Sequence, residues 1–168
     1  VSLVWIAAGL FSFSYMRKKR ERRRFFGFYL MAYGVLAGLG FAGNLITFYL
    51  FYEMMTLLTL PLVLHDRTKE AIMAGLKYLL YSLCGAYMVL FGLYVIYRYA
   101  NTLSFTPKGV LDMGLVTGRE PLLLLAAFMM LAGFSVKAGC FPMHGWLPSA
   151  HPVAPAPASA VMSGIIVK

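Results

Sequence analysis

Four charged residues stand in stretches of this chain that are otherwise apolar enough to be buried in lipid: Glu53, Lys77, Lys137 and Lys168. An ionisable group near the centre of a bilayer costs about 2.5 kcal/mol or more, so membrane proteins seldom keep one there without a function. The movement of charge through a membrane is therefore the first hypothesis.

The four charges lie at different depths in their predicted helices. At about 1.5 Å per residue, Glu53 lies roughly 14 Å past the turn at Asn44, near the middle of a hydrocarbon core about 30 Å thick. Lys137 and Lys168 are also expected to be deep. Lys77 lies only about 10 Å inside its helix, so its long side chain reaching an interface stays an alternative. For Glu53 and Lys137 the alternative is a pair that only holds two helices together.

The composition indicates an integral membrane protein made of helices. Of the 168 residues, 61% are hydrophobic and 12% are charged, against about 25% charged in a soluble domain. The predicted fold class is an all-α polytopic bundle of transmembrane helices with one helix broken by proline. The net charge of +9 does not indicate a nucleic-acid partner, because seven of the fifteen basic residues lie in the loop 16–24 between two apolar stretches.

No cofactor is expected in this chain. The two cysteines, Cys84 and Cys140, lie in apolar segments without a CxxC spacing, so we expect no iron–sulfur cluster, structural zinc or disulfide. Neither glycine-rich signature for phosphates or dinucleotides is present. Any redox chemistry must belong to other chains.

The apolar stretches predict one transmembrane domain over residues 1–168. Because the first stretch is short for a bilayer and the last stops within a helix, we expect a central slice of a larger domain. Nine Lys or Arg residues lie in the loops 16–24 and 65–70 and three in the loop 98–120, so the first two loops are predicted to be cytoplasmic. The predicted helices cover residues 1–15, 25–42, 44–64, 71–97, 121–140 and 157–168.

Two prolines interrupt the chain after residue 140 at membrane depth. Because proline removes a backbone donor and blocks the preceding turn, Pro142 and Pro148 predict a helix that is broken near 142–148. Such breaks mark ion sites in transporters. His144 and His151 flank the break, and two interpretations stay open for them: they pass protons, or they cap the broken helix.

Two segments resemble a known family. The segment KAGCFPMHGWLPSAHPVAPAPASAVMSGIIVK (residues 137–168) resembles the signature of the antiporter-like subunits shared by respiratory complex I, membrane-bound hydrogenases and the multi-subunit Mrp-type sodium/proton antiporters. The segment NLITFYLFYEMMTL (residues 44–57) is similar to the family's glutamate helix. A departure is Ser149, which stands where many relatives carry aspartate.

The resemblance implies a fold and a set of roles. It implies a half-channel built on an inverted repeat, with Glu53 paired to Lys137 on the broken helix. Lys168 would come next in a buried polar relay, and Lys77 would belong to the same network. Whether Lys137 holds its proton would depend on how close the Glu53 carboxylate lies.

The function implied by the resemblance is proton translocation in a redox-driven ion pump, complex I-like or hydrogenase-like. The partners would be other membrane subunits, the lipid bilayer and protons, in a prokaryotic cytoplasmic (inner) membrane. A subunit of a secondary sodium/proton antiporter is the alternative, but sodium prefers several oxygen ligands and Glu53 is the one buried carboxylate predicted here. A non-conducting membrane scaffold is a third hypothesis.

Overall fold

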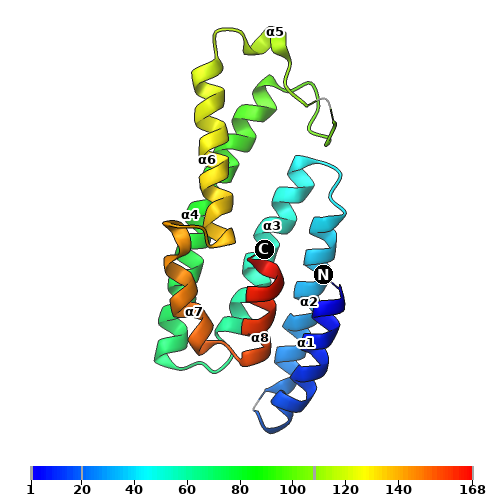
Figure 1. Cartoon of the computed structure of the whole chain (residues 1–168), viewed down its shortest axis with the longest axis vertical. Helices are drawn as coiled ribbons and strands as arrows, with labels where there is room; N and C mark the ends of the chain where they lie inside the picture. The colour runs from blue at the N-terminus through cyan, green and yellow to red at the C-terminus, as the bar shows by residue number, and fades with distance from the viewer. Residues whose placement is uncertain (1, 20, 108, 168) are drawn as a thin grey trace.

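Helices make up most of the chain in a computed structural model that describes residues 2–19, 21–107 and 109–167 (Figure 1). Within these described ranges no β-strand occurs, only two isolated bridges, so the predicted all-α class is confirmed. Three helical stretches are long and apolar enough to cross a membrane: α3 (Leu45–Val63), α4 (Lys69–Tyr99), and Glu120–Val153, which contains α6 (Glu120–Ala138) and α7 (Leu147–Val153).

Helix α2 (Arg22–Gly40) and α3 follow each other in the chain and pack together as a hairpin. The α3 helix begins at Asn44, whose side chain accepts a hydrogen bond from the Thr47 amide at 2.8 Å. This N-cap satisfies a backbone donor that the helix itself leaves free. It fixes the register of the helix that carries Glu53.

The long helix α4 packs most extensively on α6. Glycines allow this contact: a Cβ atom added at Gly85 would lie 2.9 Å from the Gly133 carbonyl oxygen and 3.1 Å from Val136 Cβ. Small residues let the backbones of membrane helices approach closely. The packing holds the last turns of α6 firmly against α4.

The helix α6 ends before the prolines. Gly139 follows Ala138 in the left-handed conformation at φ 64°, and the Cys140 amide donates to the Ser135 carbonyl oxygen at 3.0 Å. This is a glycine C-cap, which satisfies carbonyl groups at a helix end. A 3₁₀ turn, η2 (Met143–Trp146), and α7 follow. The helix therefore stops at a glycine, and neither the breaking role of the prolines nor the inverted repeat is established.

The connection between α4 and α6 folds back over the α2–α3 turn. It contains the short helix α5 (Met113–Val116), at the top of Figure 1. The Leu45 amide donates to the Leu103 carbonyl oxygen at 3.0 Å, and the Phe105 amide to that of Gly43 at 3.1 Å. These bonds close the end of the bundle near the start of α3.

Ion pairs join the loops before α2 and before α4. Lys19 Nζ lies 3.0 Å from Asp66 Oδ2, and Arg67 lies 3.1 Å from the Glu21 carboxylate. The Arg24 guanidinium, bonded to Glu21 at 3.0 Å, holds the pKa of that carboxyl below 4.5, and Asp66 raises the pKa of Lys19 above 10.5. The two loops therefore lie on one face of the molecule.

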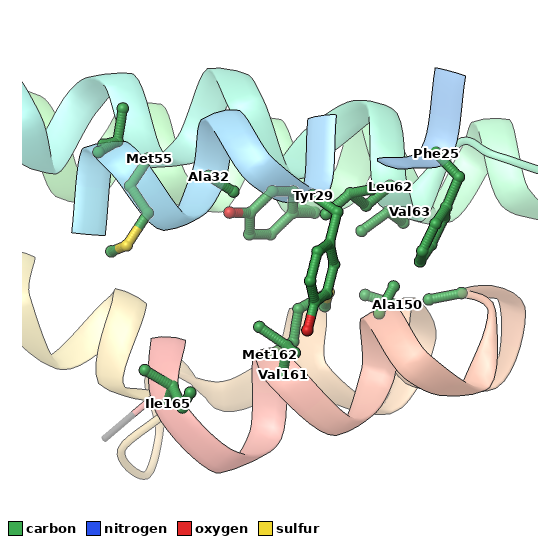
Figure 2. Packing of buried hydrophobic residues seen from close by; sticks show 14 of the residues in the cluster. Phe25, Tyr29, Ala32, Met55, Leu62, Val63, Ala150, Val161, Met162 and Ile165 are labelled. Carbon is green, nitrogen blue, oxygen red and sulfur yellow. The ribbon is translucent and has the colours of Figure 1, made fainter. Parts of the chain in front are cut away.

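The apolar core joins side chains from helices at both ends of the chain. Helix α1 (Ser2–Tyr15) lies beside α8 (Ala156–Val161), which continues into the π-helical turn η3 (Met162–Ile166). Figure 2 shows buried side chains of the α2–α3 hairpin facing those of α7, α8 and η3: Phe25, Tyr29, Ala32, Met55, Leu62, Val63, Ala150, Val161, Met162 and Ile165. This packing holds α3, the helix that carries Glu53, against the C-terminal helices.

Candidate functional site: a buried lysine between two membrane helices

Lys137 stands in the last turn of α6 and points at α3. Lys137 is only 4% exposed. The ammonium donates to the Tyr52 carbonyl oxygen at 2.7 Å and to Thr56 Oγ1 at 2.5 Å. Both partners are uncharged. The lysine is therefore buried, hydrogen-bonded and not neutralised by either of these partners.

Tyr52 contacts this turn of α6 through its carbonyl oxygen, its ring and its hydroxyl. Its carbonyl oxygen accepts from Lys137, and the lysine Nζ lies 4.1 Å from the centre of its ring, a distance typical of a cation–π contact. Its hydroxyl donates to the Gly133 carbonyl oxygen at 3.2 Å. A single aromatic side chain thus fixes α3 to α6 at the level of the lysine.

Glu53 follows Tyr52 directly on α3 and is half-buried. Its Oε1 atom is buried and has no hydrogen-bond partner in the part of the chain that the structure describes. The carboxylate forms no ion pair with Lys137 at a limit of 4.0 Å among the described residues, although the two charges interact electrostatically. A buried polar atom without a partner is uncommon in folded proteins and calls for an explanation.

Hydroxyl groups continue from the lysine toward α4. Thr59 Oγ1 lies 3.2 Å from the Thr56 carbonyl oxygen and 2.8 Å from the Tyr78 hydroxyl. Thr56, Thr59 and Tyr78 are each at most 2% exposed. Ser82, one helical turn after Tyr78, places another buried hydroxyl on the same side of α4. The interior between α3 and α4 is thus polar along this line.

Lys77 lies elsewhere on α4, with an exposed side chain. Its Nζ donates to Ser149 Oγ of α7 at 3.0 Å, and both residues line a cavity of about 730 Å³. The structure brings Lys77 to α7 rather than to the contacts of Lys137. Its place in the predicted relay stays a prediction.

The two histidines lie along α7 and its preceding turn. They line one cavity of about 650 Å³ together with Pro148. His144 is exposed, whereas His151 Nδ1 forms a 2.6 Å hydrogen bond with Ser159 Oγ. Pro142, at the start of η2, is exposed. Lys168 lies outside the described residues.

The sequence prediction missed Tyr52 and Thr56. A signal for them exists, because Tyr52, Thr56 and Thr59 recur at intervals of four and three residues and so share one face of α3. A polar stripe on an otherwise apolar membrane helix indicates a polar neighbour. In the described ranges no group of three or more His, Cys, Asp or Glu residues is placed to hold a metal ion.

Comparison with known proteins identifies the family. Residues 42–168 match the family described as NADH:quinone oxidoreductase/Mrp antiporter, transmembrane. The chain belongs to this family. The matched range includes the buried Lys137, the half-buried Glu53 and the whole segment that follows α6.

Relatives in this family come from three kinds of protein. The chain is 32% identical to hydrogenase-4 component B of Escherichia coli and 31% identical to NADH-quinone oxidoreductase subunit N of Desulforudis audaxviator, each over 100% of its length. It is 25% identical to a Na(+)/H(+) antiporter subunit of Bacillus subtilis over 99% of its length. It spans 25%, 33% and 34% of these three proteins, respectively.

A solved structure has the same fold. The chain superimposes with a TM-score of 0.78 on a chain of the membrane-bound sulfane sulfur reductase, an archaeal respiratory membrane complex. The match covers 99% of this chain and 34% of the other, at 22% identity. The antiporter-like membrane class predicted from the two sequence segments is confirmed.

Proposed function

We propose that this chain carries the proton-conducting half-channel of an antiporter-like subunit in a redox-driven ion pump, with protons passing through Glu53, Lys137 and Lys168. The observation that carries the proposal is the Lys137 ammonium, buried at 4% exposure and held by uncharged oxygens of Tyr52 and Thr56. A buried lysine with a permanent ion pair would keep its proton, whereas one held by neutral groups can release it.

Thr56 suits both protonation states of the lysine. A hydroxyl both accepts and donates hydrogen bonds. It accepts from the ammonium, and after rotation of the hydroxyl it can donate to the neutral amine. The site therefore keeps a hydrogen bond to Nζ whether or not the proton is present.

Glu53 is the second group that would control whether Lys137 keeps its proton. Its Oε1 atom has no partner among the described residues, so this oxygen is available to a proton or to water. A movement that brings the carboxylate to the ammonium favours the charged pair, and a movement that separates them favours release. We propose that a redox-driven change in partner subunits controls this separation and sends a proton from Lys137 toward Lys168.

The end of α6 is the point at which the proposed proton path would open to water. Lys137 stands one residue before the last residue of the helix, and the C-terminal end of a helix favours positive charge. After Gly139 the chain leaves the α-helix and continues into the 3₁₀ turn η2. Backbone of this kind at membrane depth is tolerated where it is buried in protein or lines a wet cavity.

The experiment uses the assembled complex in inside-out vesicles with an electron donor, and proton uptake is followed by a pH-sensitive dye. Glu53→Gln and Lys137→Met should abolish pumping while the subunit still assembles. Lys69→Gln, which removes an exposed positive charge, is the control and should pump normally. Pumping that survives both site substitutions would overturn the proposal.

A sodium/proton antiporter subunit is the second candidate, because one of the relatives is a protein of that kind. Transport that depends on sodium in vesicles without an electron donor would favour it. A non-conducting scaffold is the third, and substitutions that lower stability without changing transport would support that role. All three place the chain with other membrane subunits, and we propose a prokaryotic inner membrane as its location.

A further inference from the structure

A groove between α1 and α2 lies apart from the buried lysine. It has a volume of about 810 Å³. Its walls are apolar and aromatic, from Trp5 and Phe13 of α1 to Phe26 and Tyr33 of α2. Two arginines at the start of α2 also line it.

We infer that this groove binds one anionic phospholipid, with an acyl chain between α1 and α2 and the phosphate at Arg22 and Arg23. The first argument is charge. Among the residues that the structure describes, neither arginine has a carboxylate within 4.0 Å, whereas the next one, Arg24, is paired with Glu21. Two unpaired cations at the mouth of an apolar groove suit a lipid that carries a negative headgroup.

The arginines at the mouth of the groove are positioned to bind an anion. The Arg22 guanidinium lies 5.9 Å from the ring centre of Phe13 and 5.7 Å from that of Phe26, and the two rings stack at 4.7 Å. Both arginines stand in the first turn of α2, where Glu21 forms no side-chain cap. The N-terminal end of a helix favours negative charge.

The length of the groove matches one leaflet. From Arg23 to Tyr33 is ten residues of helix, or about 15 Å, which is half of a hydrocarbon core about 30 Å thick. At the far end the Tyr33 hydroxyl bonds Ser2 Oγ at 2.9 Å, and the Tyr29 hydroxyl donates to the Trp5 carbonyl oxygen at 2.7 Å. Because these hydroxyls already have partners, the inner wall presents rings rather than free polar groups to a chain.

The charge test measures lipid retention by native mass spectrometry of the full-length protein in its complex, with phosphatidylglycerol and phosphatidylethanolamine added in equal amounts. The double substitution Arg22→Gln/Arg23→Gln should weaken phosphatidylglycerol binding about 25-fold, since each basic residue near an anionic lipid contributes about fivefold. The control, Arg17→Gln/Lys69→Gln, removes the same charge from exposed positions that do not line the groove and should retain the lipid.

A second variant tests the groove without changing charge. Leu10→Trp fills the groove from an exposed position and should displace the lipid, whereas Leu3→Trp, exposed at 84% and outside the groove, should not. Equal retention of the two phospholipids, or equal loss in the test and control variants, would overturn the inference. Protection of Leu10→Cys from a lipid-soluble thiol reagent in delipidated complex would also overturn it, because a protein segment would then fill the groove.

Discussion

Thr56 and Tyr52 decide how Lys137 is held. The threonine supplies a hydroxyl and the tyrosine a carbonyl oxygen, and neither carries charge. The glutamate that the resemblance pairs with the lysine stands one position along α3 from Tyr52, with one oxygen unbonded among the described residues. At the scale of single residues, the neutral partners are therefore as informative as the charged ones.

Removing the Thr56 hydroxyl should uncouple the lysine from α3. Thr56→Val keeps the shape but removes an acceptor from a buried ammonium, so we expect a loss of about 1–3 kcal/mol in stability and slower pumping. Thr56→Ser restores the hydroxyl and should recover most of both. Thermal unfolding of the purified complex and dye-monitored proton uptake measure the two effects. Normal pumping by Thr56→Val would exclude a role for the hydroxyl.

Two substitutions of Tyr52 separate the contribution of its ring to stability from that of its hydroxyl. Tyr52→Phe loses the bond to the Gly133 carbonyl oxygen but keeps the ring against Lys137, so a cost of about 1 kcal/mol is expected. Tyr52→Ala loses both and should cost about 3–5 kcal/mol, as for other large buried aromatic side chains. Unfolding midpoints in detergent compare the variants. Equal midpoints for the two would show that the ring contributes nothing.

At the scale of helices, the close contact of α4 and α6 is the feature that positions Lys137. Gly85→Ala should destabilise the protein, because its Cβ would lie 2.9 Å from a backbone oxygen that cannot move aside easily. Gly34→Ala on α2 has nothing within 4 Å and should stabilise by about 0.5–1 kcal/mol through helix propensity. In thermal unfolding, Gly85→Ala should lower the midpoint and Gly34→Ala should raise it. Shifts of the same sign for both variants would contradict this expectation.

The ion pairs between the two loops should respond to pH at both ends of the scale. The Glu21 carboxylate stabilises the contact above its unfolded pKa of about 4.5, and this contribution is lost as pH falls through its lower folded-state pKa. The Lys19 contribution is present below 10.5 and is lost as pH rises through its raised pKa.

Hydrogen exchange of the amides in the loop 65–70, corrected for intrinsic rates, measures this contact. Protection should be greatest between those limits and should fall at acid pH. Glu21→Gln should remove much of the acid-side change, whereas Glu70→Gln, outside these ion pairs, should leave it. An acid-side change that survives Glu21→Gln unaltered would assign it to another group.

At the scale of the whole molecule, the ion pairs put the loops before α2 and before α4 on the same face, and the side of the membrane that they face is a prediction. We expect the loops 16–24 and 65–70 to face the cytoplasm and the loop 98–120 to face the opposite side. In a protein whose Cys84 and Cys140 are replaced by serine, Arg17→Cys and Thr68→Cys should react with an impermeant reagent only from the cytoplasmic side. Thr106→Cys should react only from the other side. Labelling of all three from one side would refute this arrangement.

The sequence was sufficient for the class of fold but not for the contacts of the site. A run of apolar residues predicts a membrane helix because each backbone donor must be satisfied within it. The charges stood out because they are rare in such helices. The Lys137 contacts could not be found in this way, since they join residues 81 and 85 positions apart and depend on how α3 and α6 pack.

The end of α6 shows a related limit. The prolines predicted a break in the helix, but the residue at which α6 ends is Gly139. Its left-handed conformation could not be recognised by looking only for prolines in the sequence. The short helix α5 was also missed, because four residues give too little periodicity to recognise.

The glycine contact between α4 and α6 has a mechanical consequence. Backbones that touch leave no compliant side-chain layer to slide over, so these two helices act as a fixed reference within the subunit. Conformational work arriving from neighbouring subunits would then be absorbed by the parts that remain deformable, α3 on one side of the lysine and residues 139–153 on the other. Under the proposed mechanism, the Lys137 side chain would then stay in place while the groups around it shift.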